Sequence, residues 1–333
     1  MKNFHKARFP WGLAAVSVIF LLAACASVPK TLEDSLDRAL PLDGGAMLYL
    51  VVDVPRARPF LDYIDIEGLA KEDAAQILDK TRHAAAAVFP PNSGKRLQAA
   101  SWGNYPSFGA GLAFTSAKDW KRKRSPAGPF WYSADRDISL AFNKGQAFAA
   151  LGPAEGGAEI TAGTTPAAGP YAQGPGVPVP ETFSAFREGA CLALWLENPA
   201  EPLSRFLEGL RLPIRIPAEE FLASLVPLAS PEEASAGFPE GAAGPAGAGT
   251  PYEIRLQIRA PSETNARTLM TLFSTARIFL SRAGDAEYPE LLYRLLARPP
   301  EQEGPYLKLR SAPLNERDIA LLFALFSIYS GRD

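Results

Sequence analysis

The sequence predicts an α+β fold made of two related sheet-and-helix halves, with largely antiparallel strands. Of the 333 residues, 47% are hydrophobic and 21% are charged, which is the balance of a globular chain rather than of a disordered chain or a coiled coil. Strand patterns with alternating apolar residues share the chain with amphipathic helical patterns. Part of the first half recurs in the second half at a spacing of 144 residues.

The chain begins with a segment that is typical of a secretory signal. Lys2, Lys6 and Arg8 form a basic flank, and residues 11–24 are uncharged and mostly apolar. A helix that spans a bilayer needs about 20 apolar residues, so this stretch is too short for one. A basic flank before a short apolar core indicates a signal peptide over residues 1–24.

The end of this segment, Leu22-Ala23-Ala24-Cys25, resembles the lipobox of bacterial lipoprotein precursors. The resemblance covers residues 1–26 and implies cleavage before Cys25, a diacylglycerol on its sulfur and a palmitate-type acyl chain on the new N-terminus. Several chains hold a protein durably on a membrane, because each buried methylene contributes about 0.8 kcal/mol. The alternative is an ordinary cleaved signal with an incidental cysteine, although only 2 of the 333 residues are Cys. The resemblance implies a lipid-anchored envelope protein that faces the periplasm or the exterior. Because no Asp follows Cys25, it favours the outer membrane over the inner one.

The rest of the chain divides by composition. Pro and Gly cluster in the region between the two halves, and a second tract rich in Ala, Gly, Pro and Glu is typical of a surface loop. A short helical pattern at 30–40 follows the anchor. The expected organisation is a tether over 25–42, a first α+β half over 43–152, a Pro/Gly-rich connector over 153–186, and a second α+β half over 187–330 with a mobile loop at 230–250.

The two halves are expected to be a duplication. Residues 45–55 and 189–199 are identical at five of eleven positions, and both are β-rich runs that end at a proline. At the same spacing, the alternating pattern of 108–114 corresponds to that of 252–258. Alternation with period two predicts strands with one buried face. Chance similarity between two αβ segments is the alternative.

Other segments complete the expected elements. Residues 136–142 resemble 317–323 at a spacing of 181, so the second half would hold an insertion, which the helical pattern of 262–297 supplies. Residues 70–89 predict an amphipathic helix with one apolar face. The segment 319–329 is apolar on almost every side and predicts a helix that is either buried or docked on a partner, although the similarity to strand-like 136–142 leaves a strand open.

Few groups in the mature chain suit catalysis or metal binding. Its only histidine, His83, falls on the polar face of the predicted helix 70–89, whereas a hydrolase triad needs a base oriented by a third group. Cys191 lies in an apolar run and is expected to be a buried, inert thiol. One His and one core cysteine do not make a zinc site, and the acidic turns do not match an EF-hand. We therefore expect no catalytic residues, no metal and no cofactor.

One segment is a candidate contact surface. Residues 102–132 contain eight aromatic residues, among them three of the five tryptophans. Aromatic rings beside cations suit a glycan, an anionic headgroup or a protein partner. The alternative is that the aromatic residues are core and that the cations occupy the C-terminal end of a helix, where the helix dipole favours them. The candidate contact residues are Lys118, Trp120, Lys121, Arg122, Lys123 and Arg124.

These observations favour a binding role over a catalytic one. The formal net charge of -2 provides no basic field for nucleic acid. We expect a membrane-anchored envelope lipoprotein that binds or scaffolds something near the membrane without catalysis. Its expected partners are the membrane, through Cys25, and an envelope glycan, an anionic lipid or a protein. Two alternatives stay open: an envelope enzyme that acts on glycan or peptide through carboxylates, and a ligand-binding accessory of a transporter.

Overall fold

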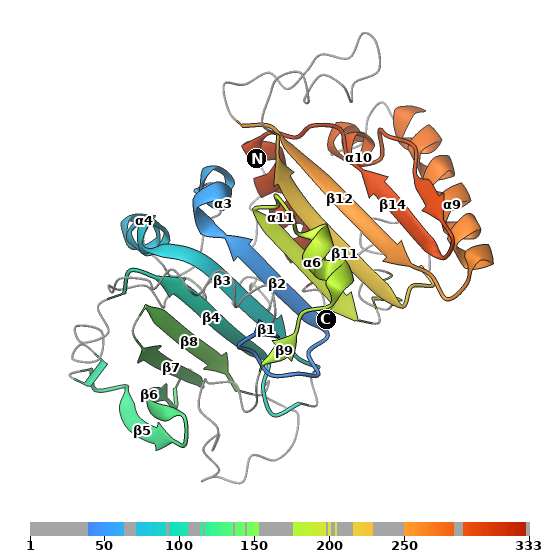
Figure 1. Ribbon diagram of the computed structural model, residues 1–333. Helices are drawn as coiled ribbons and strands as arrows, with labels where there is room; N and C mark the ends of the chain where they lie inside the picture. Colours follow the sequence, from blue (N-terminus) through green and yellow to red (C-terminus); the bar gives the residue numbers. More distant parts are fainter. Residues whose placement is uncertain are drawn as a thin grey trace, which may run out of the picture.

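A long antiparallel sheet runs through the computed structural model of the chain (Figure 1). The structure describes residues 39–62, 71–90, 93–105, 114–115, 117–135, 137–143, 145–152, 176–197, 199–200, 204, 216–228, 250–282 and 289–330. Within these residues the sheet has twelve strands, in the order β13 (Glu301–Glu303), β14 (Tyr306–Arg310), β12 (Tyr252–Arg259), β11 (Glu220–Pro227), β10 (Leu192–Glu197), β2 (Leu48–Asp53), β3 (Thr81–Val88), β4 (Leu97–Gly103), β8 (Gln146–Leu151), β7 (Ile138–Asn143), β6 (Gly128–Ser133) and β5 (Lys121–Ser125).

Helices and a small strand pair cover the two faces of this sheet. The α+β class with largely antiparallel strands is therefore confirmed. In the described part of the chain, no helix is long and apolar enough to cross a membrane. The covering elements are β1 (Ala39–Leu40), β9 (Val177–Pro178), α3 (Val54–Leu61), α4 (Lys71–Lys80), α6 (Glu181–Phe186), α9 (Glu263–Arg282), α10 (Pro289–Leu295) and α11 (Glu316–Ser330).

Each face of the sheet carries its own core. On one face, buried residues of α3, α4, α10 and α11 pack together, and α9 covers the neighbouring strands β12 and β14. On the other face, Tyr49 of β2 stacks on Trp195 of β10, with ring centroids 5.1 Å apart. Phe183 of α6 packs beside Trp195, and the pair β1–β9 closes the same cluster. Figure 1 shows α6 lying across the strands at the centre of the sheet. The central strands are thus buried on both faces.

The two copies of the repeated segment are neighbours at the centre of the sheet. Leu50 of β2 lies opposite Leu194 of β10, and these two residues are 144 positions apart in the sequence. On either side, Leu48 faces Leu196 and Val52 faces Leu192. The antiparallel register is therefore symmetric about the pair of corresponding leucines.

The other proposed correspondences do not follow this symmetry. Counting from the centre, the place that β12 holds in the second half is held in the first by β4, and most of the predicted strand at 108–114 lies outside the described residues. The correspondence between 136–142 and 317–323 is wrong, because the first segment lies in strand β7 and the second in helix α11. The duplication of the halves stays a prediction.

The expected helix over 70–89 ends at Lys80. Residues 81–88 instead form β3, which is paired with β2 on one side and with β4 on the other. Ala84, Ala85, Ala86 and Ala87 are all buried there. Alanine is the best helix former, so local propensity favours a helix. A strand covered on both faces shows no polar alternation and accepts small side chains, which explains the error.

Three further expectations fall on the ends and connections of the chain. Residues 39–40 form strand β1 rather than the end of a helix, while residues 25–38 of the tether, Cys25 among them, lie outside the described residues. The last part of the connector forms β9 and α6, and residues 153–175 lie outside the described residues, as do 230–249 of the expected mobile loop. The apolar segment 319–329 is helical, within α11, and Ile319 is buried in the core.

Candidate contact surface at the sheet edge

The predicted cations lie on the last strand of the sheet. Lys121, Arg122, Lys123 and Arg124 belong to β5, which pairs with β6, so the alternative that they occupy the C-terminal end of a helix is wrong. A tight hairpin turn joins the two strands, with Pro126 as its first central residue, and the Ser125 hydroxyl donates a hydrogen bond to the Gly128 carbonyl at 3.1 Å. The aromatic strand β6 offers β5 a partner, which a local pattern of cations does not reveal.

The cations of β5 alternate between the two faces of the sheet. Lys121 lies opposite Tyr132 of β6, and Arg122 lies opposite Trp131. Lys123 places its ammonium 4.6 Å from the centre of the Tyr132 ring, within the range of a cation–π contact. Burial, and then repulsion from Lys121, lowers the pKa of Lys123. The edge therefore presents two ammonium groups on one face and two guanidinium groups on the other.

Trp120 belongs to the aromatic cluster that supports the edge. Its ring meets that of Phe114 edge-on, with centroids 4.8 Å apart, and Phe114 stacks on Phe142 of β7 at 5.5 Å. The indole nitrogen of Trp131 donates a hydrogen bond to Thr115 Oγ1 at 3.2 Å. Trp120 is only partly exposed, so it is not the open contact residue that the contact-surface hypothesis requires. The aromatic residues pack beneath the β5 edge, and the cations form its exposed surface.

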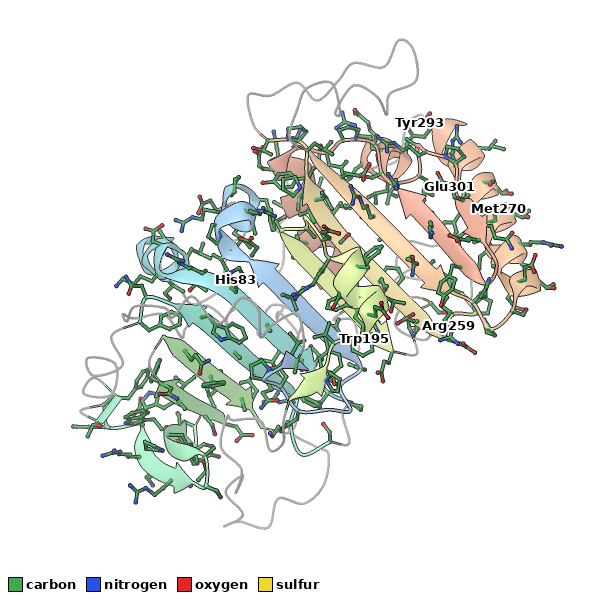
Figure 2. The ribbon with its side chains drawn as sticks, in the orientation of Figure 1. His83, Trp195, Arg259, Met270, Tyr293 and Glu301 are labelled. Carbon is green, nitrogen blue, oxygen red and sulfur yellow. The ribbon has the colours of Figure 1, made fainter. Side chains whose placement is uncertain are left out.

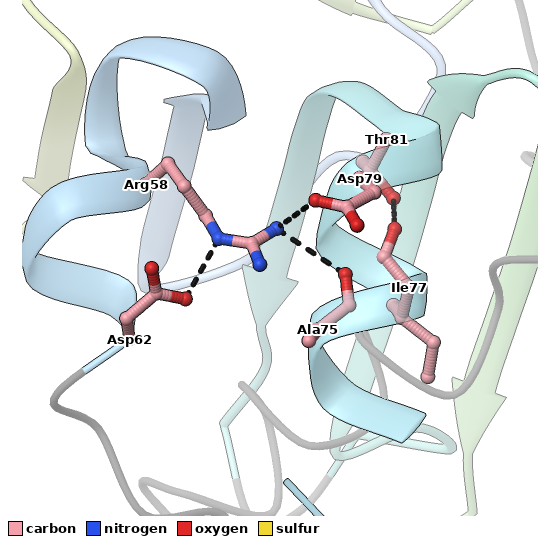
Figure 3. A network of polar contacts seen from close by, with 6 residues as sticks. All are labelled: Arg58, Asp62, Ala75, Ile77, Asp79 and Thr81. Atoms are coloured by element: carbon pink, nitrogen blue, oxygen red, sulfur yellow. Dashed lines mark hydrogen bonds and ion pairs between the residues drawn. The ribbon is translucent and has the colours of Figure 1, made fainter. Parts of the chain in front are cut away.

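Cations elsewhere in the described structure are commonly held by carboxylates. Figure 3 shows Arg58 of α3, whose Nε is 2.7 Å from Asp62 Oδ1 and whose Nη1 is 2.8 Å from Asp79 Oδ1. The same Nη1 donates to the Ala75 carbonyl at 3.2 Å, so that Arg58 joins α3 to α4.

The exposed cations near β5 differ. Within the described residues, no ion pair is formed by Lys118, Lys121, Arg122 or Arg124, all of which are exposed. Exposed charges of this kind attract an anionic partner, and salt screens the attraction.

The histidine and the cysteine have different surroundings. His83 lies on β3 and is half-buried, opposite Asp53 of β2 and Trp102 of β4, rather than on a polar helix face (Figure 2). Cys191 is fully buried, and its thiol donates to the Leu225 carbonyl at 3.2 Å. Burial raises the pKa of this thiol to about 12. The predicted burial of Cys191 is confirmed.

One buried carboxylate is not apparent from the sequence. Glu253 of β12 is 3% exposed. Its Oε1 is 2.6 Å from Arg255 Nε, and its Oε2 is 2.7 Å from Arg298 Nη1. The second contact ties β12 to the segment that follows α10. The alternating pattern of 252–259 put Glu253 on the polar face of a strand, and only the position of Arg298 in three dimensions shows that this carboxylate is enclosed.

The described residues contain no group of three or more His, Cys, Asp or Glu side chains placed to hold a metal ion. A hollow of about 350 Å³ lies between α9 and α10 and is lined by Ser274, Arg277, Ile278 and Tyr293. Its volume is at the lower end of the range for ligand pockets. A ligand-binding accessory role stays a prediction.

Comparison with known proteins identifies a shared fold. No protein-family model and no curated protein matches the chain. The structure of TP0453 in crystal form III has a TM-score of 0.51 and 14% identity, and the match covers 86% of this chain and 96% of that one. Crystal form I of TP0453 has a TM-score of 0.50 and 15% identity, covering 87% of this chain and 98% of that one. At this identity the similarity shows the α+β fold alone.

Proposed function

We propose that the protein is a membrane-anchored envelope lipoprotein that acts without catalysis, by binding an anionic partner at the β5 edge. The observation that carries this proposal is the group of exposed cations, Lys121, Arg122 and Arg124 with Lys118 close by, none of which has a carboxylate partner among the described residues. The resemblance of residues 1–26 to a lipoprotein signal supports the anchor on Cys25, with the protein more on the outer than on the inner membrane.

A row of exposed cations suits an extended anionic surface. Each Lys or Arg close to an anionic membrane surface contributes about 1 kcal/mol, and the attraction is screened beyond about 8 Å at physiological salt. The cations stand on a strand whose backbone is fixed by pairing with β6 and whose base is the cluster of Phe114, Trp120 and Trp131. The surface is therefore held in place before the partner arrives, which lowers the entropic cost of binding.

The test measures binding of the mature chain to vesicles that contain anionic phospholipid and to purified cell-wall glycan, at low and at high salt. Arg122→Ala/Arg124→Ala removes two exposed cations from β5. The control, Arg82→Ala/Arg317→Ala, removes two exposed cations that lie on β3 and α11. We expect the β5 variant to bind at least about tenfold more weakly and the control to bind normally. Binding that is insensitive to salt, or that is equal in the two variants, contradicts the proposal.

A Trp120→Ala variant separates the two parts of the surface. Because Trp120 packs against Phe114, its removal is expected to lower the free energy of unfolding more than the affinity for the anionic partner. Loss of binding with unchanged stability would show that the indole itself contacts the partner.

A further inference from the structure

The two ends of the sheet carry opposite charge. At one end β5 has the sequence Lys-Arg-Lys-Arg-Ser, and at the other end β13 has the sequence Glu-Gln-Glu. Both are outermost strands, and no other strand of the described structure pairs with their outer edges. Figure 1 shows β5 at the opposite end of the sheet from β14, and Figure 2 places Glu301 near that far end. Unpaired backbone groups on an outer strand are a template for another strand.

The acidic side chains of β13 share one face of the sheet. The Gln302 amide donates to the backbone carbonyl of Glu263 at 3.4 Å, so this side chain points toward α9. Glu301 and Glu303, one residue away on either side, point to the opposite face and are exposed. A hydrogen bond from Lys308, and the charge of that ammonium group, lower the pKa of Glu303. Glu303 therefore remains ionised at neutral pH.

The ammonium groups of β5 lie on the same face. Directly opposed residues of neighbouring strands share a face, and Glu301 faces Lys308, which faces Gln257, which faces Leu222. Leu222 belongs to the same buried cluster as Phe130 of β6.

Lys123 lies opposite Phe130, and Lys121 stands two residues earlier on β5. One face of the molecule thus has two carboxylates, two residues apart, on one edge, and two ammonium groups with the same spacing on the other edge.

We propose that β13 of one copy pairs with β5 of a second copy, so that the sheet continues from molecule to molecule. This inference rests on the proposed function, because it identifies a second copy of this chain as an anionic partner of β5. Pairing two β5 edges would oppose lysines, and pairing two β13 edges would oppose glutamates, so repulsion disfavours both. Only unlike edges match, and such a head-to-tail contact repeats.

The contact is short, because β13 has three residues. A small interface of this kind is weak in dilute solution. Attachment of all copies to one membrane raises their effective concentration, in the way a linker does for two joined modules.

Two variants of the full chain test this pairing. Lys121→Glu/Lys123→Glu makes the β5 edge acidic, and Glu301→Lys/Glu303→Lys makes the β13 edge basic. Each is co-expressed in two differently tagged copies, and capture of one tag is followed by measurement of the other at low salt. For each variant alone, we expect the amount of the second copy that is recovered with the first to fall at least about tenfold, because the two edges now carry like charge. Arg82→Glu/Arg317→Glu changes the net charge as the first variant does but touches neither edge, and it should be captured like the wild type.

Mixing the two variants gives the decisive result. The acidic β13 of the first variant then meets the basic β5 of the second, and the basic β13 of the second meets the acidic β5 of the first. We expect the mixture to recover capture, which also shows that both variants are folded. The proposal is overturned if either variant alone co-captures its second copy at the wild-type level, or if the two variants do not co-capture each other.

A separate measurement distinguishes this proposal from the one on which it rests. Glu301→Lys/Glu303→Lys leaves β5 intact and should bind anionic vesicles or glycan at least as well as the wild type does, because its new charges are positive. If that binding holds while co-capture ignores both edge variants, self-pairing is wrong and the anionic partner is a different molecule.

Discussion

Phe60 of α3 contacts rings that lie far from it in the sequence. It is fully buried. Its ring meets Tyr252 of β12 edge-on at 5.8 Å and stacks on Phe323 of α11 at 5.9 Å. Replacement by alanine removes both ring contacts and leaves a cavity under α3, where neighbouring segments come from both halves.

The expected cost of Phe60→Ala is a large part of the stability. Truncation of a buried Phe to Ala costs about 3–5 kcal/mol, and each aromatic pair accounts for about 0.5–1.5 kcal/mol of such a loss. A natural domain is stable by only about 5–15 kcal/mol. Phe60→Leu, the matched control, fills most of the volume, and we expect it to cost less than about 1.5 kcal/mol apart from the aromatic contacts.

Urea unfolding of the mature chain, followed by circular dichroism and by tryptophan fluorescence, measures the effect. We expect the midpoint to fall at an unchanged m-value, with the two probes still coincident. A loss below about 1 kcal/mol for Phe60→Ala, or an equal loss for alanine and leucine, would refute the assignment of this ring to a well-packed junction.

Four further predictions concern other parts of the chain. Labelled fatty acid should enter the wild-type protein but not Cys25→Ser, and equal labelling would remove the lipid anchor. Glu253→Gln leaves two guanidinium groups with an uncharged partner and should destabilise by about 3 kcal/mol or more in urea unfolding, whereas a neutral result would show that the carboxylate is not enclosed. The Cys191 thiol should resist thiol reagents at pH 8 until the protein unfolds, because burial raises its pKa to about 12. In the unfolded chain the pKa of this thiol is about 8.5, so the free energy of unfolding should fall as the pH rises from there toward 12. Cys191→Ala should lack this contribution to the fall. His83→Ala should change stability by no more than about 1 kcal/mol and leave binding to anionic vesicles unchanged, and a loss of binding with an intact fold would give His83 a role.

Part of the candidate site could be predicted from the sequence, because the local enrichment in cations and aromatic residues is visible there. The cluster of cations and aromatic rings around Trp120 is visible in the sequence, and so is the apolar run that buries Cys191. The sequence did not show which residues of the cluster pack in its base and which are exposed. Trp120 packs on Phe114, and the cations form an outer strand, because β6 supplies backbone hydrogen bonds that no local pattern contains.

The sequence by itself determined the α+β class and the strand at 252–258, and it favoured a helix at 319–329 without excluding a strand. The strand follows from local periodicity, since a strand with one solvent face displays that face in its own residues. Helix α11 is settled by its place in the fold, because a segment that is apolar on almost every side has no polar face to fix its period. Tertiary structure decided the rest. Ala84–Ala87 form a strand because β2 and β4 flank them and both faces are covered. The opposite charges of β5 and β13 become a pair of complementary edges only because ten strands stand between them in one sheet. Strand order is a relation between segments distant in sequence, so it is fixed by the packing of the whole chain and not by any single segment.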